Sequence, residues 1–150
     1  MKNLFLSVLM LLLIASSCKE KQVVNQDDID KQLIINYLEE NNITAESNAS
    51  GLFYVIRESG NERHPTATST ITVSYSGRLL NNQPFDQGSF FTNPLQNLIA
   101  GWQQGLPLIG EGGKITLYIP SSLGYGNQST PNIPANSVLI FDISLHYFSD

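Results

Sequence analysis

Three segments of the chain place an apolar residue at every second position, and this period of two constrains the fold more than any other feature. The segments are residues 70–80, 114–119 and 139–145. Because side chains of a strand point alternately to its two faces, each segment predicts a half-buried β-strand. A shorter apolar run, residues 52–57, follows Ser50-Gly51 and predicts a fourth strand.

One short helix is expected between these strands, at residues 95–104. Residues 85–86 form a short extended piece, which we expect Gln87-Gly88 to break. Residues 105–113 hold Pro107 and several glycines and predict a turn, while residues 120–136 predict a long loop. The order of elements indicates an α+β fold, a curved antiparallel sheet wrapped around a short helix.

A second helix is expected before the sheet, in a helix-and-linker segment at residues 28–49. Asp27 or Asp28 provides an N-cap. We interpret this helix as a packing or spacer element and not as a binding site. Its predicted apolar face consists of Ile29, Leu33, Tyr37 and Leu38.

The first residues are typical of an export signal. A charged start, Met1-Lys2-Asn3, precedes an apolar run from Leu4 to Ala15, which is too short to span a bilayer comfortably. We predict that residues 1–17 are a signal peptide that is removed. A retained membrane anchor is the alternative.

Cys18 is the only cysteine and directly follows Ala15-Ser16-Ser17. This arrangement resembles a bacterial lipoprotein signal, in which the cysteine is lipidated and becomes the new N-terminus. A chance free thiol is the alternative. With residues 18–27 as a tether, the resemblance implies a lipid-anchored protein of the cell envelope, periplasmic or at the outer membrane. Lys19 is not the aspartate associated with inner-membrane retention.

Several classes of function are disfavoured by composition. The net charge of -5 and the lack of a basic cluster argue against a nucleic-acid partner. Two histidines and one cysteine make a zinc cluster improbable, and no Gly-x-Ser-x-Gly elbow supports a hydrolase. Residues 110–114 resemble a phosphate-binding loop only faintly. Such a loop leads into a helix, whereas these residues lead into a predicted strand. We expect no metal and no cofactor.

Six short motifs resemble the FK506-binding protein (FKBP) family of peptidyl-prolyl cis-trans isomerases in their order and spacing. They are Val73-Ser74-Tyr75-Ser76-Gly77, Phe85-Asp86, Leu98-Ile99-Ala100-Gly101-Trp102, Gly124-Tyr125-Gly126, Ile133-Pro134 and Leu139-Ile140-Phe141-Asp142. The resemblance covers roughly residues 50–147, and we assign residues 50–150 to the isomerase domain. It is strongest to bacterial lipoprotein members with an N-terminal helix.

The resemblance implies a pocket for proline-containing polypeptides. Trp102 would form its floor, and Tyr125 would donate a hydrogen bond to a substrate carbonyl. Asp86 would either orient Tyr75 or meet the rotating carbonyl. The implied polar residues are Tyr75, Asp86 and Tyr125, and the implied apolar walls are Phe85, Leu98, Ile99, Ile133 and Phe141.

The chain also departs from that family. The link between Phe85-Asp86 and Trp102 is short and contains no arginine, which puts affinity for FK506-like macrolides in doubt. Within it, one of Phe90 and Phe91 is expected to reach the core while the other points away. An active isomerase for exported proteins is the main interpretation. The alternatives are a non-catalytic chaperone or peptide-binding module and a structural lipoprotein of the envelope.

Overall fold

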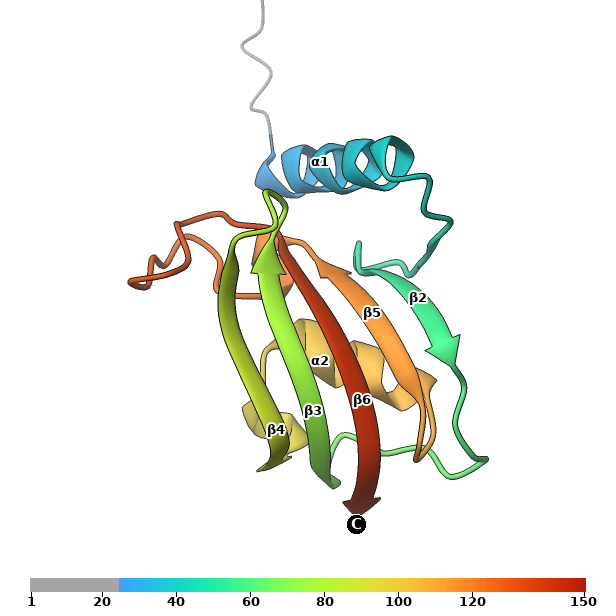
Figure 1. The fold of residues 1–150 in the computed structure, drawn as a ribbon. Coiled ribbons are helices and arrows are strands. Elements are labelled where there is room, and N and C mark those ends of the chain that lie inside the picture. The colour runs from blue at the N-terminus through green and yellow to red at the C-terminus, as the bar shows by residue number, and fades with distance from the viewer. Residues whose placement is uncertain (1–24) are drawn as a thin grey trace, which may run out of the picture.

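The computed structural model describes residues 25–150, which form one antiparallel sheet and two α-helices (Figure 1). The predicted signal peptide at residues 1–17 and the predicted lipidation at Cys18 lie outside the described residues. The strands are β1 (Glu46–Ser47), β2 (Phe53–Glu58), β3 (Thr70–Leu79), β4 (Pro84–Pro94), β5 (Lys114–Ile119) and β6 (Leu139–Ser149). Their order across the sheet is β1-β2-β5-β6-β3-β4, with every pair antiparallel. The predicted α+β fold is therefore confirmed.

The helices lie on different sides of this sheet. Helix α2 (Ala100–Gly105) packs against one face, here called the inner face, and α1 (Gln26–Glu40) crosses one end of the sheet (Figure 1). Short 3-10 turns extend the connections. They are η1 (Leu95–Asn97), η2 (Leu106–Leu108) and η3 (Ser121–Leu123). None of the helices within residues 25–150 is long and apolar enough to cross a membrane.

Alternate side chains of the central strands enter two separate cores. Leu117 and Ile119 of β5 point to the inner face and join the core that contains Trp102. Tyr118, between them, points to the outer face and packs with Ile34 and Leu38 of α1. The burial of this stretch of β5 on both faces follows from α1, which covers one end of the outer face.

The face that α1 buries agrees with the predicted one at Leu38 and differs from it in the first two turns. Ile29 and Leu33 are 39% and 43% exposed, whereas Asp30, Ile34 and Leu38 are buried. The buried acid has a specific partner, because Oδ2 of Asp30 accepts the backbone N–H of Ser121 at 2.7 Å. A charge-assisted bond of this kind offsets the desolvation of the carboxylate, and hydropathy alone does not reveal it.

The N-terminal boundary of α1 also corrects the sequence analysis. Asn25, and not Asp27 or Asp28, is the N-cap residue, and its side chain accepts the N–H of Asp27 at 3.3 Å. Asp27 and Asp28 lie instead in the first turn, where negative charge interacts favourably with the helix dipole.

Three further predictions about local structure are corrected. Gln87-Gly88 does not break the extended piece, because β4 pairs with β3 across this point and continues to Pro94. The predicted helix at residues 95–104 is divided into η1 and α2, with Leu98 extended between them. The carbonyl of Leu98 accepts a hydrogen bond from the Gln103 side chain at 2.6 Å, which compensates for the missing helical partner. Gly105, predicted as the start of a turn, is the last residue of α2.

Candidate peptide-binding site

Three aromatic rings meet on the inner face of the sheet. Trp102, at the start of α2, is only 4% exposed and contacts Tyr75 of β3 and Phe141 of β6. The ring centroids lie 5.1 Å and 5.2 Å from that of Trp102, and both neighbours stand nearly perpendicular to it, at 82° and 88°. Edge-to-face packing of this kind is favourable and directional, so the three rings hold each other in fixed orientations.

These rings surround a cavity of about 350 Å³. Its volume lies at the small end of the usual range for ligand sites, which is roughly 300–1,000 Å³. Most of the lining residues are those that the sequence analysis named. The lining consists of Tyr75, Asp86, Phe91, Asn97, Leu98, Ile99, Trp102, Tyr125 and Phe141.

Two predicted wall residues stand behind this lining. Phe85 packs edge-on against Phe141, with ring centroids 5.3 Å apart, and supports that wall from outside. Gly77 makes the contact feasible, since a Cβ atom there would lie 2.7 Å from the Phe85 ring. Ile133 is 6% exposed and belongs to the hydrophobic core. Both residues position the cavity without lining it.

Phe91 and Asn97 line the cavity but were not assigned to it from sequence. Phe91 meets Tyr75 edge-on at 5.8 Å. Phe90, in contrast, is 65% exposed. The expectation that one of the two rings reaches the core is confirmed, and the structure identifies Phe91 as that ring. Asn97 ends η1 and lines the cavity; its position directly before Leu98 and Ile99 is the sequence signal that points to it.

A hydrogen-bonded pair provides the polar part of the lining. The Tyr75 hydroxyl donates to Oδ2 of Asp86 at 2.9 Å. The other oxygen of this carboxylate, Oδ1, accepts the backbone N–H of Gln87 at 2.8 Å, which fixes its orientation. Burial, together with the hydrogen bond to Asp86 and its negative charge, raises the pKa of Tyr75 to about 12. Tyr75 is therefore protonated near neutral pH.

Tyr125 brings a second phenol to the cavity from the loop after η3. It is 40% exposed, so its hydroxyl is accessible to a ligand. Burial of part of the ring, and then the negative charge of Asp86, raise the pKa of Tyr125. The hydroxyl is thus a neutral donor in the same pH range. Gly88 contributes by its lack of a side chain, since a Cβ there would lie 2.6 Å from Cε1 of Tyr75.

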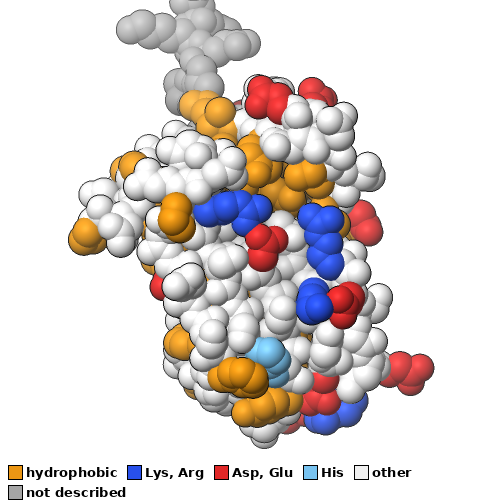
Figure 2. All heavy atoms as spheres, in the orientation of Figure 1, with side chains coloured by type: hydrophobic (Ala, Val, Ile, Leu, Met, Phe, Trp, Pro, Cys, Tyr) orange, Lys and Arg blue, Asp and Glu red, His pale blue; other side chains and the backbone are white. Residues whose placement is uncertain are grey.

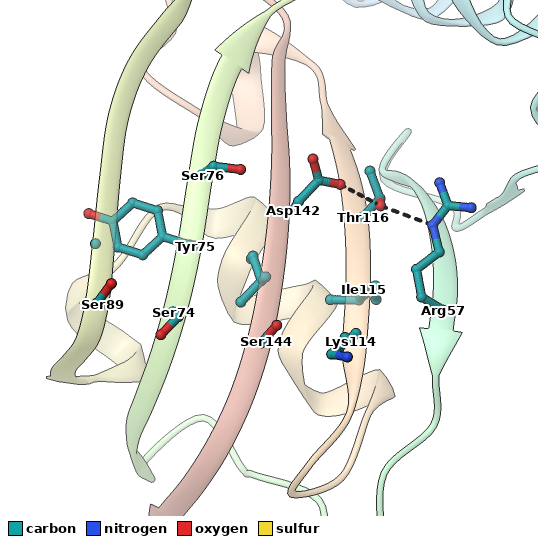
Figure 3. A pocket seen from close by; sticks show the side chains of 12 residues that line it. Arg57, Ser74, Tyr75, Ser76, Ser89, Lys114, Ile115, Thr116, Asp142 and Ser144 are labelled. Carbon is teal, nitrogen blue, oxygen red and sulfur yellow. Dashed lines mark hydrogen bonds between the residues drawn. The ribbon is translucent and has the colours of Figure 1, made fainter.

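A second hollow lies on the outer face of the sheet and has a different character (Figure 3). Thr116 accepts a hydrogen bond from Nε of Arg57 at 3.3 Å and donates one to Asp142 at 2.7 Å. Arg78 forms an ion pair with the same carboxylate. Basic and acidic side chains are interspersed over this face (Figure 2). The outer-face hollow has a similar volume, about 390 Å³, but it has no aromatic floor like the one that Trp102 forms in the first cavity.

Comparison with known proteins agrees with this geometry. Residues 61–146 match the family model of the FKBP-type peptidyl-prolyl cis-trans isomerases. The chain is 48% identical over 102 residues to an enzyme of that type, FkpA of Buchnera aphidicola, and the match covers 65% of this chain and 40% of the relative. It is 34% identical over 135 residues to Escherichia coli FkpA, covering 87% and 49%. The chain thus spans about half the length of the curated relatives it matches.

Solved structures of the same type superpose on this chain. The crystal structure of Escherichia coli FkpA gives a TM-score of 0.74 at 33% identity, covering 83% of this chain and 59% of that one. A peptidyl-prolyl cis-trans isomerase from Pseudomonas syringae gives a TM-score of 0.74 at 25% identity, covering 83% and 94%. Both superpositions extend over 83% of this chain, which is more than the sheet and α2 together occupy.

Proposed function

The chain belongs to the FKBP-type peptidyl-prolyl cis-trans isomerase family, and from this premise we propose that it catalyses rotation about X-Pro bonds in polypeptides. The observation that carries the proposal is the aromatic cavity floored by Trp102, with the Tyr75–Asp86 pair and the Tyr125 hydroxyl at its edge. A proline ring is small, apolar and compact, which suits a cavity lined mainly by aromatic and aliphatic side chains.

The reaction requires shape and polarity rather than bond-breaking chemistry. The barrier to X-Pro rotation arises from amide resonance, and the uncatalysed process takes tens of seconds or longer. The twisted amide has less charge separation than the planar one, so an apolar cavity disfavours it less. No bond is cleaved, and the mechanism needs no nucleophile.

The polar groups take roles that follow from their positions. Tyr125 is exposed and neutral, and we assign it to donate to a substrate carbonyl. The 2.9 Å bond supports Asp86 as the group that orients Tyr75. Asp86 also lines the cavity, so a direct interaction with the rotating carbonyl is the competing role.

The test is an isomerisation assay on residues 19–150 with short Leu-Pro and Phe-Pro peptides, with and without FK506. Catalysis above the spontaneous rate is the expected result. Trp102→Ala, which removes the floor, is the matched inactive variant. A folded protein that suppresses aggregation of an unfolded client but does not accelerate isomerisation would favour the non-catalytic chaperone instead.

We further propose that the protein acts on exported polypeptides while anchored to a membrane of the cell envelope. The support is the signal-like segment at residues 1–17 and the cysteine that follows it. Acyl chains on Cys18 would contribute roughly 0.8 kcal/mol per buried methylene, so several chains give firm attachment. Of the predicted tether at residues 18–27, Gln26 and Asp27 belong to α1, so the tether would end at Asn25.

A further inference from the structure

The choice between Phe90 and Phe91 is made by a bulge in β4. Val73 pairs with Phe91, and Tyr75 pairs with Gly88, so Ser74 alone faces two residues, Ser89 and Phe90. An extra residue in one strand changes which side chains beyond it share a face with the partner strand. Because Val73 points to the inner core, its partner Phe91 points inward too. Without the bulge, Phe90 would pair with Val73 and Phe91 would point outward.

The bulge carries a conformation that needs support. Phe90 has a φ of +50°, in the left-handed region that bulky side chains rarely adopt. Its ring is 65% exposed, so burial in the core does not hold it there. The strained residue must therefore be stabilised by local contacts.

Three contacts on the outer face provide that support. Oγ of Ser74 accepts the backbone N–H of Phe90 at 3.2 Å. The same oxygen lies 2.7 Å from Nε2 of His146 on β6. The Phe90 ring stacks on the His146 ring, with centroids 4.3 Å apart and planes 13° from parallel. Ser74 thus joins the backbone of the bulge to the residue on which the bulged side chain rests.

We propose that Ser74, His146 and Phe90 form a clamp that positions Phe91 in the cavity wall, so that His146 and Ser74 are positioning residues for substrate binding. The consequence for substrate rests on the proposed isomerase function. Phe91 contacts Tyr75 edge-on at 5.8 Å, and Tyr75 contacts Trp102 at 5.1 Å. The outer-face clamp is therefore connected to the cavity floor through two ring contacts.

The neighbouring residue Tyr147 provides a matched control. It is also an aromatic residue on β6 and is 56% exposed. Tyr147 pairs with Thr72 and Leu145 pairs with Val73, so the irregularity in the pairing of β3 with β6 lies at His146, between these two pairs. Tyr147→Ala removes an aromatic side chain from the same strand and leaves the three clamp contacts in place.

The experiment compares His146→Ala, Phe91→Ala, the double variant and Tyr147→Ala in the peptide isomerisation assay. We expect His146→Ala to raise KM about three- to tenfold with kcat within about twofold of wild type, since a wall contact acts alike on ground and transition states. Phe91→Ala should show the same pattern, and Tyr147→Ala no change. The double variant should be no worse than Phe91→Ala, because residues that act through each other are not additive. Additive losses, or an unchanged KM in His146→Ala, overturn the clamp.

Quenching of Trp102 fluorescence by acrylamide gives a readout that needs no activity. Trp102 is the sole tryptophan, and displacement of Phe91 should expose it more in His146→Ala than in Tyr147→Ala. If wild type turns over no peptide, the proposed function fails. Stronger quenching in His146→Ala than in Tyr147→Ala would still support the clamp, and equal quenching in the two variants would overturn it. If His146→Ala melts near the assay temperature, Ser74→Ala, which retains the ring stack, carries the same comparison.

Discussion

The Tyr75 hydroxyl donates a hydrogen bond to Oδ2 of Asp86 across 2.9 Å, joining β3 to β4 beside the cavity. If Asp86 acts by orienting Tyr75, Asp86→Leu and Tyr75→Phe should each lower kcat/KM about tenfold, or about 1.4 kcal/mol of transition-state stabilisation. The double variant should then show little further loss. A full rate in Tyr75→Phe with a loss in Asp86→Leu would instead assign Asp86 to the substrate carbonyl. Thermal melting of each variant checks that the domain remains folded.

Tyr125→Phe removes a hydroxyl but retains the ring. We expect kcat/KM to fall roughly tenfold, which corresponds to one modest hydrogen bond in the transition state. Tyr147→Phe makes the same chemical change at an exposed position of β6 and should have no effect. Equal rates for Tyr125→Phe and wild type would exclude Tyr125 as the carbonyl donor.

The raised pKa of Tyr75 has a consequence at alkaline pH. An unfolded tyrosine titrates near pH 10, whereas Tyr75 in the folded protein titrates at about 12. Between about pH 10 and about pH 12 the folded state therefore retains this proton while the unfolded state has lost it. The stability linked to Tyr75 is fully present below about pH 10 and is lost as the pH rises through about 12. Denaturant unfolding of wild type and Tyr75→Phe should show a stability difference that is constant below about pH 10 and shifts against wild type above it. A constant difference throughout would show that the pKa is unshifted.

The same titration can be followed by tyrosinate absorbance. Burial is the largest cause of the raised pKa of Tyr75, followed by the hydrogen bond to Asp86. Asp86→Asn should therefore lower the pKa of Tyr75 without returning it to the ordinary value.

Binding of FK506 is expected to be weaker than in relatives with a longer link between Asp86 and Trp102. Of the described residues between Asp86 and Asn97, Phe91 is the one that lines the cavity. A bound macrolide therefore buries less apolar area on that side, and each Å² that is not buried removes roughly 25 cal/mol of binding free energy. Titration with FK506, followed by Trp102 emission, measures the affinity. Saturation at nanomolar ligand would show that the short link carries no penalty.

Membrane attachment should depend on Cys18. We expect Cys18→Ala to yield a soluble or unprocessed protein, because acyl chains supply the membrane affinity. Cys18→Ser, which keeps the size of the side chain, should behave in the same way. Fractionation of cell envelopes measures the outcome, and continued attachment of a variant whose signal has been cleaved would contradict the lipid anchor.

The sequence by itself determined four of the strands, β2, β3, β5 and β6, and the floor of the cavity. Residues 114–119 alternate in a way that only a strand satisfies, and the structure confirms β5 at those bounds. Trp102 could be assigned to the floor because it belongs to one of six motifs that occur in the same order in the FKBP family. The first signal depends on residues close together in the chain and the second on the order of motifs between Val73 and Asp142, and both can be read without knowing which strands pair.

Tertiary structure alone decided that Phe91 lines the cavity while Phe85 stands behind it, and that α1 buries Asp30. Phe90 and Phe91 are identical side chains in adjacent positions, and the bulge opposite Ser74 selects between them. Asp30 is buried because the backbone N–H of Ser121, 91 positions away, meets its carboxylate. Strand register and partners distant in the chain arise only when the sheet assembles, since a shift by one residue reverses the face of every side chain beyond it.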